Sequence, residues 1–380
     1  MYYTTNIGQF CELNSNYEYL LSNAPYYVTT KHYFIEDTEY VMFCYNQIKS
    51  DFSNDIVKEC RGIIFKRGHW DKPVCHAFDK FHNYGETYAS NIDWNTARVT
   101  EKIDGSLIKV WYNKDTDNFV ISTNGTINAF EAELNNPKYK TFGELFVNGV
   151  KDLSEFIDIC KRNNRSTYMF ELVSPFNRVV IPYEDIDIYF LGERDFNDNL
   201  TSFTDSICTK DFESIGIKTP EVYPLFSLYD VISASKKLPW NEEGYVVQDA
   251  LNNRIKVKSP KYVIAHYARN NNQISKKYLI DVVLKNEQEE FKTYCSDYNS
   301  ELTSIEADMT EYQQNLQAYY NKLRITLPIN YTRKEYAAIV KTYPTWAQPY
   351  LFSGISVYNY VSNWNSSKWE KELAKREESL

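Results

Sequence analysis

The stretch KIDGSLIKVWY, residues 102–112, decides how this chain folds. Its first four residues, Lys102-Ile103-Asp104-Gly105, place an amine and a carboxylate two positions apart, just before a glycine. The residues after the glycine are rich in β-branched and aromatic side chains, which predicts a strand over 106–112. A second such run, 118–122, follows the polar segment NKDTD, so the two runs predict a hairpin. By itself a K-x-D-G tetrapeptide is common, and its meaning depends on the rest of the chain.

Further strands are expected on both sides of this hairpin. The run 61–65 is expected to pair with 74–78 across a polar turn. A helix is predicted over 141–162, because apolar side chains recur there at helical intervals. Since strands and helices do not alternate regularly, the pattern predicts an α+β domain with a mostly antiparallel sheet. The remaining predicted strands are 167–173, 179–183, 186–192, 244–248 and 254–258.

The pattern changes near residue 269. The polar segment ARNNNQISKK, residues 268–277, predicts a linker. Beyond it, apolar residues recur every three or four positions from Leu302 to Leu323, which predicts one long amphipathic helix. More helix is expected at 333–342 and 350–364, followed by a charged tail at 368–380. We therefore predict two domains, residues 1–268 and an all-helical C-terminal domain at 269–380.

Composition and charge exclude several classes of protein. Of the 380 residues, 43% are hydrophobic and 24% are charged, which is an ordinary globular balance. With 42 Lys and Arg against 51 Asp and Glu, the net charge of −9 excludes a basic protein that coats nucleic acid. A local basic cleft remains compatible, because affinity for nucleic acid follows the local field. No apolar run approaches the roughly eighteen residues of a membrane helix, and the N-terminal residues lack a signal-peptide pattern. We therefore expect a cytoplasmic protein without a membrane partner.

The seven cysteines indicate no disulfide framework. Their number is odd, no CxxC occurs, and the closest two, Cys60 and Cys75, lie fifteen positions apart. Reduced thiols are expected, as in a cytosolic protein. A metal site built from these two cysteines with His69 and His76 remains an alternative, although its spacing matches no recognised pattern.

A series of further motifs surrounds Lys102 in a fixed order. Lys256 and Lys258 are alternate residues of one predicted strand, so they face the same side of it. Glu171 lies inside an apolar strand, where a carboxylate is unusual unless it has a partner. In chain order the motifs are Arg61-Gly62, Lys80-Phe81, Lys102-Ile103-Asp104-Gly105, Phe170-Glu171-Leu172, Glu243-Gly244-Tyr245-Val246 and Lys256-Val257-Lys258. This ordered set resembles the covalent nucleotidyltransferases, which are ATP-dependent polynucleotide ligases and mRNA capping enzymes.

That resemblance extends over about residues 40–262. Four runs narrow it: Glu59-Cys60-Arg61-Gly62-Ile63; Lys80-Phe81 with Asn83; Phe170-Glu171 through Pro175, Asn177 and Arg178; and Lys256 to Ser259 with Tyr262 and His266. On these runs the sequence most resembles the phage RNA ligase 1 family, the T-even type of tRNA-repair ligase. DNA ligases and capping enzymes usually continue into a β-barrel after the last lysine motif, whereas this sequence continues with predicted helices. A helical C-terminal domain is what the phage family implies, and there it helps to select tRNA.

The resemblance implies an ATP-dependent RNA ligase that joins RNA 5′-phosphate and 3′-hydroxyl ends. The reaction would pass through lysyl-AMP and RNA-adenylate intermediates and would repair RNA, including nicked tRNA, during phage infection. ATP and Mg²⁺ are the implied cofactors, and we expect a monomer in the bacterial host cytoplasm. Residues 1–268 would form the adenylyltransferase domain and 269–380 the domain for RNA or tRNA specificity. The implied catalytic residues are Lys102, Glu171 and Glu243; the ATP-binding residues Tyr45, Arg61, Lys80, Lys102, Gly105, Lys256 and Lys258; and the metal ligands Asp104, Glu171 and Glu243.

Other interpretations stay open. The same motifs would suit a nicked-DNA ligase or a GTP-using capping guanylyltransferase, and a catalytically silent RNA-binding protein could have kept the pocket. The family tends to carry a basic residue just before the glycine of the strand after K-x-D-G, where this chain has Asn124 before Gly125. A neutral amide adds no charge, so nucleotide affinity is expected to depend more on the remaining lysines. The acidic residues Glu287, Glu289 and Glu290 favour a solvated helix face over a second metal site.

Overall fold

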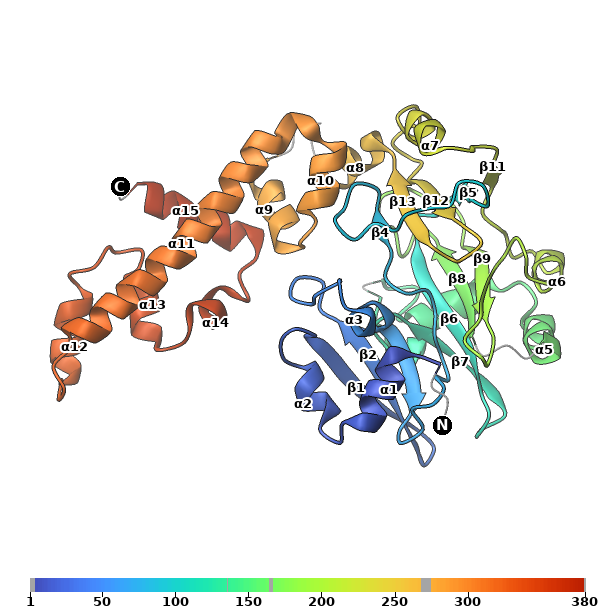
Figure 1. Ribbon diagram of the computed structural model, residues 1–380, viewed down its shortest axis with the longest axis horizontal. Coiled ribbons are helices and arrows are strands. Elements are labelled where there is room, and N and C mark those ends of the chain that lie inside the picture. Colours follow the sequence, from blue (N-terminus) through green and yellow to red (C-terminus); the bar gives the residue numbers. More distant parts are fainter. Residues whose placement is uncertain (1–3, 135, 164–166, 268–274, 379–380) are drawn as a thin grey trace. The chain divides into compact units, whose positions relative to one another are not determined.

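The structure is a computed structural model that describes residues 4–134, 136–163, 167–267 and 275–378. The chain divides into two compact units, Met1–His266 and Tyr267–Leu380. The predicted domain boundary was after residue 268, and most of the predicted linker at 268–277 lies outside the described residues. Each unit has secondary structure and a core of its own (Figure 1).

Three sheets build the first unit, and their neighbouring strands are antiparallel except for β4, which runs parallel to β13. The first sheet has the order β1-β2-β3, with β1 Val28–Ile35, β2 Thr38–Tyr45 and β3 Arg61–Lys66. The second has the order β10-β9-β8-β6-β7, with β6 Ser106–Asn113, β7 Asn118–Thr123, β8 Thr167–Val173, β9 Asp187–Arg194 and β10 Leu200–Ser202. The third has the order β11-β5-β12-β13-β4, with β4 His82–Asn83, β5 Arg98–Glu101, β11 Val222–Tyr223, β12 Gly244–Gln248 and β13 Arg254–Lys258.

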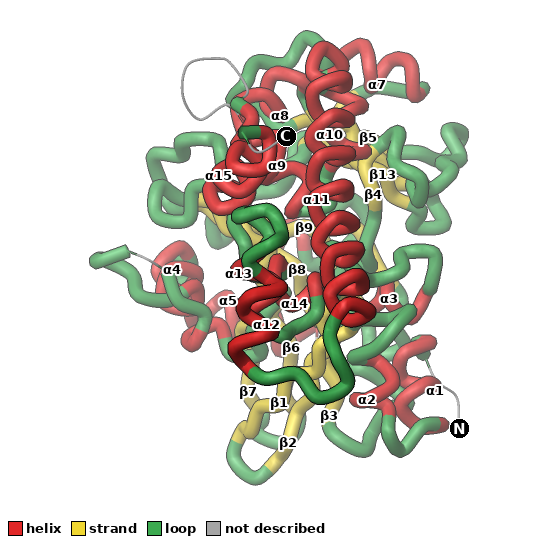
Figure 2. Tube along the Cα trace, turned by 90° about the vertical axis from the view of Figure 1, so that its left-hand side faces the viewer, coloured by secondary structure: helices red, strands yellow, loops and turns green. Residues whose placement is uncertain are grey.

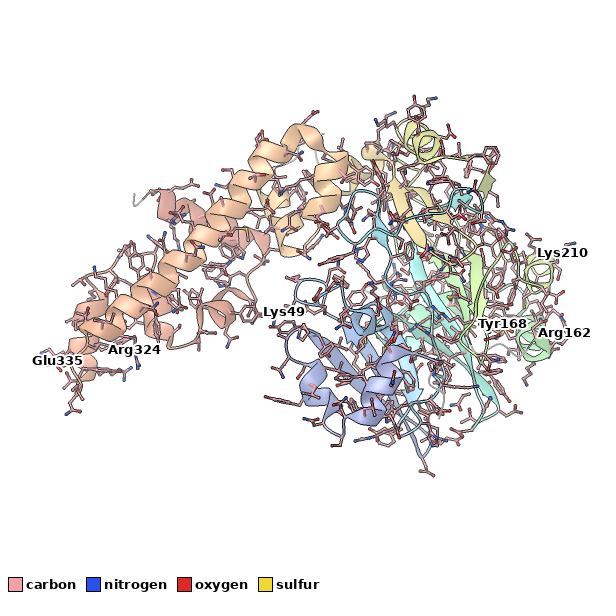
Figure 3. All side chains as sticks on the ribbon, in the orientation of Figure 1. Lys49, Arg162, Tyr168, Lys210, Arg324 and Glu335 are labelled. Atoms are coloured by element: carbon pink, nitrogen blue, oxygen red, sulfur yellow. The ribbon has the colours of Figure 1, made fainter. Side chains whose placement is uncertain are left out.

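Helices contribute to three of the hydrophobic cores in this unit. The second sheet shares its core with helices α4, α5 and α6, where Phe170 and Phe190 of the sheet contact Phe212 of α6 with ring centroids 5.3 and 4.8 Å apart. Figure 3 shows Arg162 and Lys210 on the outer side of α5 and α6, while Tyr168 lies within the sheet. The helices of the unit are α1 Asn6–Leu13, α2 Tyr17–Leu21, α3 Asp55–Glu59, α4 Phe142–Gly149, α5 Leu153–Asn163, α6 Thr209–Ser214, α7 Leu228–Ser235 and α8 Pro260–Tyr267.

The predicted hairpin of 106–112 and 118–122 is confirmed, with Lys109 opposite Ser122. The hairpin of 61–65 and 74–78 is wrong: β3 pairs with β2, and residues 74–78 contribute one isolated bridge from Cys75 to Ile64. The strand predicted at 179–183 is also wrong, because two backbone amides there donate to a carboxylate rather than to a strand. The predicted helix at 141–162 is two helices, since the backbone leaves the helix after Gly149 and the Asp152 carboxylate accepts the amide of Glu155 to begin α5.

Helices are the only regular secondary structure in the described part of the second unit (Figure 2). The stripe predicted between Leu302 and Leu323 is buried on α11, and Tyr312 of this stripe lies 4.8 Å from the Trp346 ring. The predicted helix at 350–364 is interrupted at Gly354, whose φ of +69° ends α13. The predicted charged tail forms α15. The helices are α9 Lys276–Leu284, α10 Gln288–Tyr294, α11 Asn299–Thr326, α12 Arg333–Val340, α13 Gln348–Ser353, α14 Val357–Val361 and α15 Ser366–Glu377.

The predicted fold class is therefore confirmed: a mostly antiparallel α+β unit followed by helices. Among the helices of the described residues, none combines the length and the apolar character that crossing a bilayer requires.

Candidate active site

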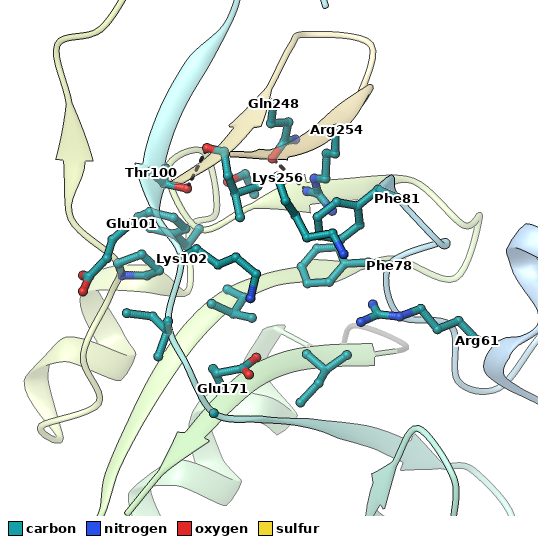
Figure 4. A pocket seen from close by; sticks show the side chains of 18 of the residues that line it. Arg61, Phe78, Phe81, Thr100, Glu101, Lys102, Glu171, Gln248, Arg254 and Lys256 are labelled. Carbon is teal, nitrogen blue, oxygen red and sulfur yellow. Dashed lines mark hydrogen bonds between the residues drawn. The ribbon is translucent and has the colours of Figure 1, made fainter. Parts of the chain in front are cut away.

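A pocket of about 340 Å³ is lined by side chains from both five-stranded sheets (Figure 4). This volume is in the range of pockets that bind small molecules. The structure places most of the predicted site residues in its lining, while Asp104, Glu243 and Lys258 are outside the lining. The predicted residues that line it are Tyr45, Arg61, Lys80, Lys102, Gly105, Glu171 and Lys256.

Lys102 lies directly after β5, and both its backbone N–H and its side-chain Nζ donate hydrogen bonds. Its backbone N–H donates to the carbonyl of Gly244 at 2.9 Å. Its Nζ donates to Oε2 of Glu243 at 2.7 Å, and Nζ of Lys258 lies 3.6 Å from Oε1 of the same carboxylate. The Glu243 side chain is 4% exposed, whereas the Lys102 side chain is 21% exposed. A buried carboxylate thus lies between two lysines, and only Lys102 of these three residues reaches the pocket lining.

Glu171 faces the pocket from β8, across from Lys102 (Figure 4). It is paired with Leu107 of β6 in the sheet register. Burial raises the pKa of the Glu171 carboxyl to about 7, although the positive charges of Lys102 and Arg61 oppose this shift. A carboxyl with such a pKa exchanges its proton near neutral pH.

Asp104, the carboxylate of the K-x-D-G motif, is 4% exposed and is fully engaged within the protein. Its Oδ2 accepts the backbone N–H groups of Val180 and Ile181 at 2.9 and 2.8 Å. Its Oδ1 accepts the hydroxyl of Tyr262 at 2.7 Å. Asp104 therefore connects the Lys102 loop to the segment after β8 and to helix α8.

The carboxylates implied as magnesium ligands do not form a chelating set. Asp104 and Glu243 have the partners given above, which leaves Glu171 facing the pocket. Over the ranges that the structure describes, no group of three or more His, Cys, Asp and Glu side chains is arranged to hold a metal ion. The seven cysteines form no disulfide within the part of the chain that the structure describes. The metal role of the three carboxylates stays a prediction, and the residues present do not fit a metal site formed before a nucleotide binds.

Cations and aromatic rings form the opposite wall of the pocket. Nζ of Lys80 lies 5.5 Å from the ring centre of Tyr45, and Nζ of Lys256 lies 5.4 Å from that of Phe81. The Arg61 guanidinium lies 5.9 Å from the same Phe81 ring. Its Nη1 is buried without a hydrogen-bond partner among the described residues. Aromatic faces hold cations in place without neutralising them, so this wall suits an anionic ligand.

Sequence reasoning missed Arg254, which lies 4.1 Å above the ring of Phe78 and donates to Gln248 at 2.8 Å (Figure 4). Burial lowers the pKa of Arg254 to about 9. The signal was present, because Arg254 is two residues before Lys256 on the same face of β13. Asn124, where the sequence departs from the family pattern, lines the pocket, and its Oδ1 is buried without a hydrogen-bond partner in the described chain.

Comparisons with known proteins assign this chain to a family. The RNA ligase family model of the T4 type 1 class matches residues 59–262, and the chain belongs to this family.

Two viral proteins are similar to the chain. It is 28% identical over 262 residues to the putative bifunctional polynucleotide kinase/RNA ligase of Autographa californica nuclear polyhedrosis virus. It is 25% identical over 289 residues to the RNA ligase of Rhodothermus phage RM378. These matches cover 65% and 61% of this chain but only 36% and 65% of the two relatives. The chain is also similar to a solved archaeal ATP-dependent RNA ligase, with a TM-score of 0.49, 14% identity and 82% of each chain covered.

Proposed function

We propose that this protein is an ATP-dependent RNA ligase in which Lys102 is the nucleophile. The observation that carries the proposal is the contact of Lys102 Nζ with Glu243 Oε2 at 2.7 Å, at the edge of a pocket whose other wall is cationic. Membership of the RNA ligase family supports RNA as the substrate.

In the first step the Lys102 amine attacks the α-phosphorus of ATP. A P–N bond forms, the bond between the α-phosphorus and the bridging oxygen breaks, and pyrophosphate leaves. The amine must lose a proton to attack, and Glu243 is the carboxylate within hydrogen-bond distance to accept it. Lys258, on the other oxygen of Glu243, keeps that carboxylate oriented.

The cationic wall would hold the phosphates during this step. Arg61, Lys80 and Lys256 come from three different segments, so together they can surround the α-phosphate and the leaving pyrophosphate. Apolar side chains in the same lining, Leu107 and Val246 among them, offer a surface for the purine. Mg²⁺ bound to the triphosphate would add charge neutralisation there.

In the second step an oxygen of the RNA 5′-phosphate attacks the phosphorus of lysyl-AMP. The P–N bond breaks and returns the Lys102 amine, and the RNA carries an A(5′)pp(5′) end. In the third step the 3′-hydroxyl of the other RNA end attacks the 5′-phosphorus of that RNA, and AMP leaves. The pocket cations serve each step, because every transition state carries negative charge on phosphate oxygens.

The helical unit would select the RNA, including nicked tRNA, in a monomer that acts in a host cytoplasm. Exposed basic residues at the end of α11 and the start of α12, namely Arg324, Arg333 and Lys334, support this role together with the exposed ring of Tyr331. Stacking on aromatic rings and contact with phosphates are the common means of holding single-stranded RNA. Replacing the three basic residues by Ala should reduce sealing of nicked tRNA more than it reduces enzyme–AMP formation.

The test is covalent labelling. The protein is incubated with Mg²⁺ and α-³²P-ATP or α-³²P-GTP, denatured, and mapped for the labelled peptide. We expect label from ATP on Lys102, none in Lys102→Ala, and normal labelling in Lys210→Ala, a matched exposed lysine on α6. Label from GTP instead would indicate a capping enzyme, and sealing of nicked DNA alone a DNA ligase. RNA binding with no label from either nucleotide, in protein free of bound AMP, would indicate a silent binding protein.

A further inference from the structure

A lysine that the reaction above does not use, Lys109, lies directly behind the pocket wall. It comes from β6, seven residues after Lys102, and its side chain is 0% exposed. Its Nζ donates to the backbone carbonyl of Gly62. Gly62 follows Arg61, which enters the pocket from β3.

Three groups meet at this point with no space between them. Gly62 has a φ of +78°, and a Cβ added to it would lie 2.5 Å from the carbonyl oxygen of Asn124 and 2.8 Å from Nζ of Lys109. The Lys109 nitrogen is thus against the backbone of Gly62 and close to that of Asn124. Since Arg61 and Asn124 both line the pocket, Lys109 supports two adjacent parts of its wall from within the protein.

Burying the Lys109 ammonium at this position is unfavourable in free energy. Fully buried lysines are rare, and taking an ammonium out of water costs several kcal/mol unless its surroundings compensate. Burial lowers the pKa of the Lys109 ammonium; the thiols of Cys75 and Cys44 oppose this shift, and the guanidinium of Arg61 adds to it. An apolar side chain of similar length would occupy this site at a lower cost. The cost is explained if the charge has a task in the pocket.

We propose that Lys109 is a positioning residue for the nucleotide. Its ammonium holds the backbone of Gly62 and Asn124 in place and supplies, from behind the wall, the positive charge that the neutral Asn124 side chain does not. This inference rests on the proposed function, because the phosphates of ATP are the anion that the charge would serve.

The test is the affinity for α,β-methylene-ATP, measured by calorimetry in the full chain. Lys109→Gln keeps an N–H donor and removes the charge, and it should weaken binding by about tenfold, as expected for loss of a charge-assisted interaction. Adding Asn124→Lys to this variant brings an ammonium to the same wall from the residue after β7, and it should restore affinity to within about threefold of the original. Adding Asn124→Gln instead, a larger but neutral side chain, should restore nothing.

Rescue by Asn124→Lys separates a role in nucleotide binding from a role in stability. If thermal unfolding shows that Lys109→Gln is not folded, Lys109→Met, which buries no polar group, is measured in its place. Unchanged affinity in a folded Lys109 variant, or lost affinity that Asn124→Lys does not restore, would overturn the proposal. Failure of both Lys109 variants to fold would assign the residue to the fold and would also overturn it. A wild-type protein that binds the analogue but forms no lysyl-AMP from ATP would overturn the ligase proposal alone.

Discussion

Lys102 and Glu243 are 141 positions apart in the sequence, yet Nζ of the lysine lies 2.7 Å from Oε2 of the glutamate. The contact follows from the third sheet, in which β12 pairs with β5 so that Tyr245 lies opposite Glu101. Each residue is the neighbour of a strand end, and the ladder between the strands fixes their separation. The amine and the carboxylate are therefore brought together by the pairing of the two strands.

Glu243→Gln should slow lysyl-AMP formation by about 100-fold, the usual size of a lost general base. The amide still accepts a hydrogen bond from Lys102 but does not take up its proton. Affinity for the ATP analogue should change much less, because Glu243 is outside the pocket lining. Single-turnover labelling with α-³²P-ATP measures the rate. Glu12→Gln, an exposed residue of α1, is the control, and equal rates in the two variants would contradict the assignment.

Asp104 and Tyr262 should contribute to stability as one unit. Tyr262→Phe removes one hydrogen bond and should lower the free energy of unfolding by about 1 kcal/mol, while Asp104→Asn leaves buried amides poorly paired and should cost about 2–3 kcal/mol. Because the two residues are in contact, the double variant should lose less than the sum, by about 1 kcal/mol. Urea unfolding measures all three proteins. Strict additivity would mean that the observed hydrogen bond contributes nothing.

Glu171 should make the stability of the nucleotide-free protein depend on pH. Its pKa is about 7 in the folded state and near the ordinary value of 4.5 when unfolded, so the folded state binds the proton more tightly between these values. The stabilisation is present below pH 4.5 and is lost as the pH rises through 7, by about 3 kcal/mol. Glu171→Gln should remove this dependence. Compared with the original protein, the variant should therefore have a higher relative free energy of unfolding at pH 8 than at pH 5. The exposed Glu184→Gln is the control in urea unfolding, and parallel pH profiles for the two variants would refute the assignment.

Gly105→Ala should disturb the pocket, whereas Gly125→Ala should not. A Cβ at Gly105 would lie 2.5 Å from the carbonyl oxygen of Leu172 on β8, while the nearest atom to a Cβ at Gly125 is Nζ of Lys31 at 3.9 Å. Gly105→Ala therefore pushes β8, and with it Glu171, away from Lys102. We expect a loss of about 1–3 kcal/mol for Gly105→Ala and less than about 0.5 kcal/mol for Gly125→Ala in thermal unfolding. Equal effects of the two substitutions would contradict this packing.

Sequence reasoning succeeded where a local pattern determines the structure. The β-branched and aromatic residues of 106–112 predicted β6, and the recurrence of apolar residues from Leu302 to Leu323 predicted α11. It failed where the outcome depends on a distant partner. The segment at 179–183 looks like a strand, but its amides are taken by Asp104, which is far away in sequence.

The N-terminal sheet also contains a strand that the local sequence pattern did not predict. Strand β1 was not predicted, because most of its side chains are exposed or half-buried and no clean alternation marks it. At the site, the motifs grouped Arg61, Lys80, Lys102 and Lys256, and all four line one pocket. The motifs did not indicate that Asp104 and Glu243 would already have protein partners. Packing determines which carboxylate oxygens remain available to a ligand, and the spacing of motifs in the sequence does not predict this.

The hydrogen bond between Asp104 and Tyr262 also determines where this protein can be divided. Helix α8 follows the last lysine motif and looks like the beginning of the helical half, but Tyr262 on it completes the K-x-D-G loop. A hybrid that keeps the chain through His266 retains every partner of Asp104, whereas one spliced at Lys258 loses the Tyr262 hydroxyl. We therefore expect the surroundings of Asp104 to survive replacement of the helical unit when the splice comes after His266.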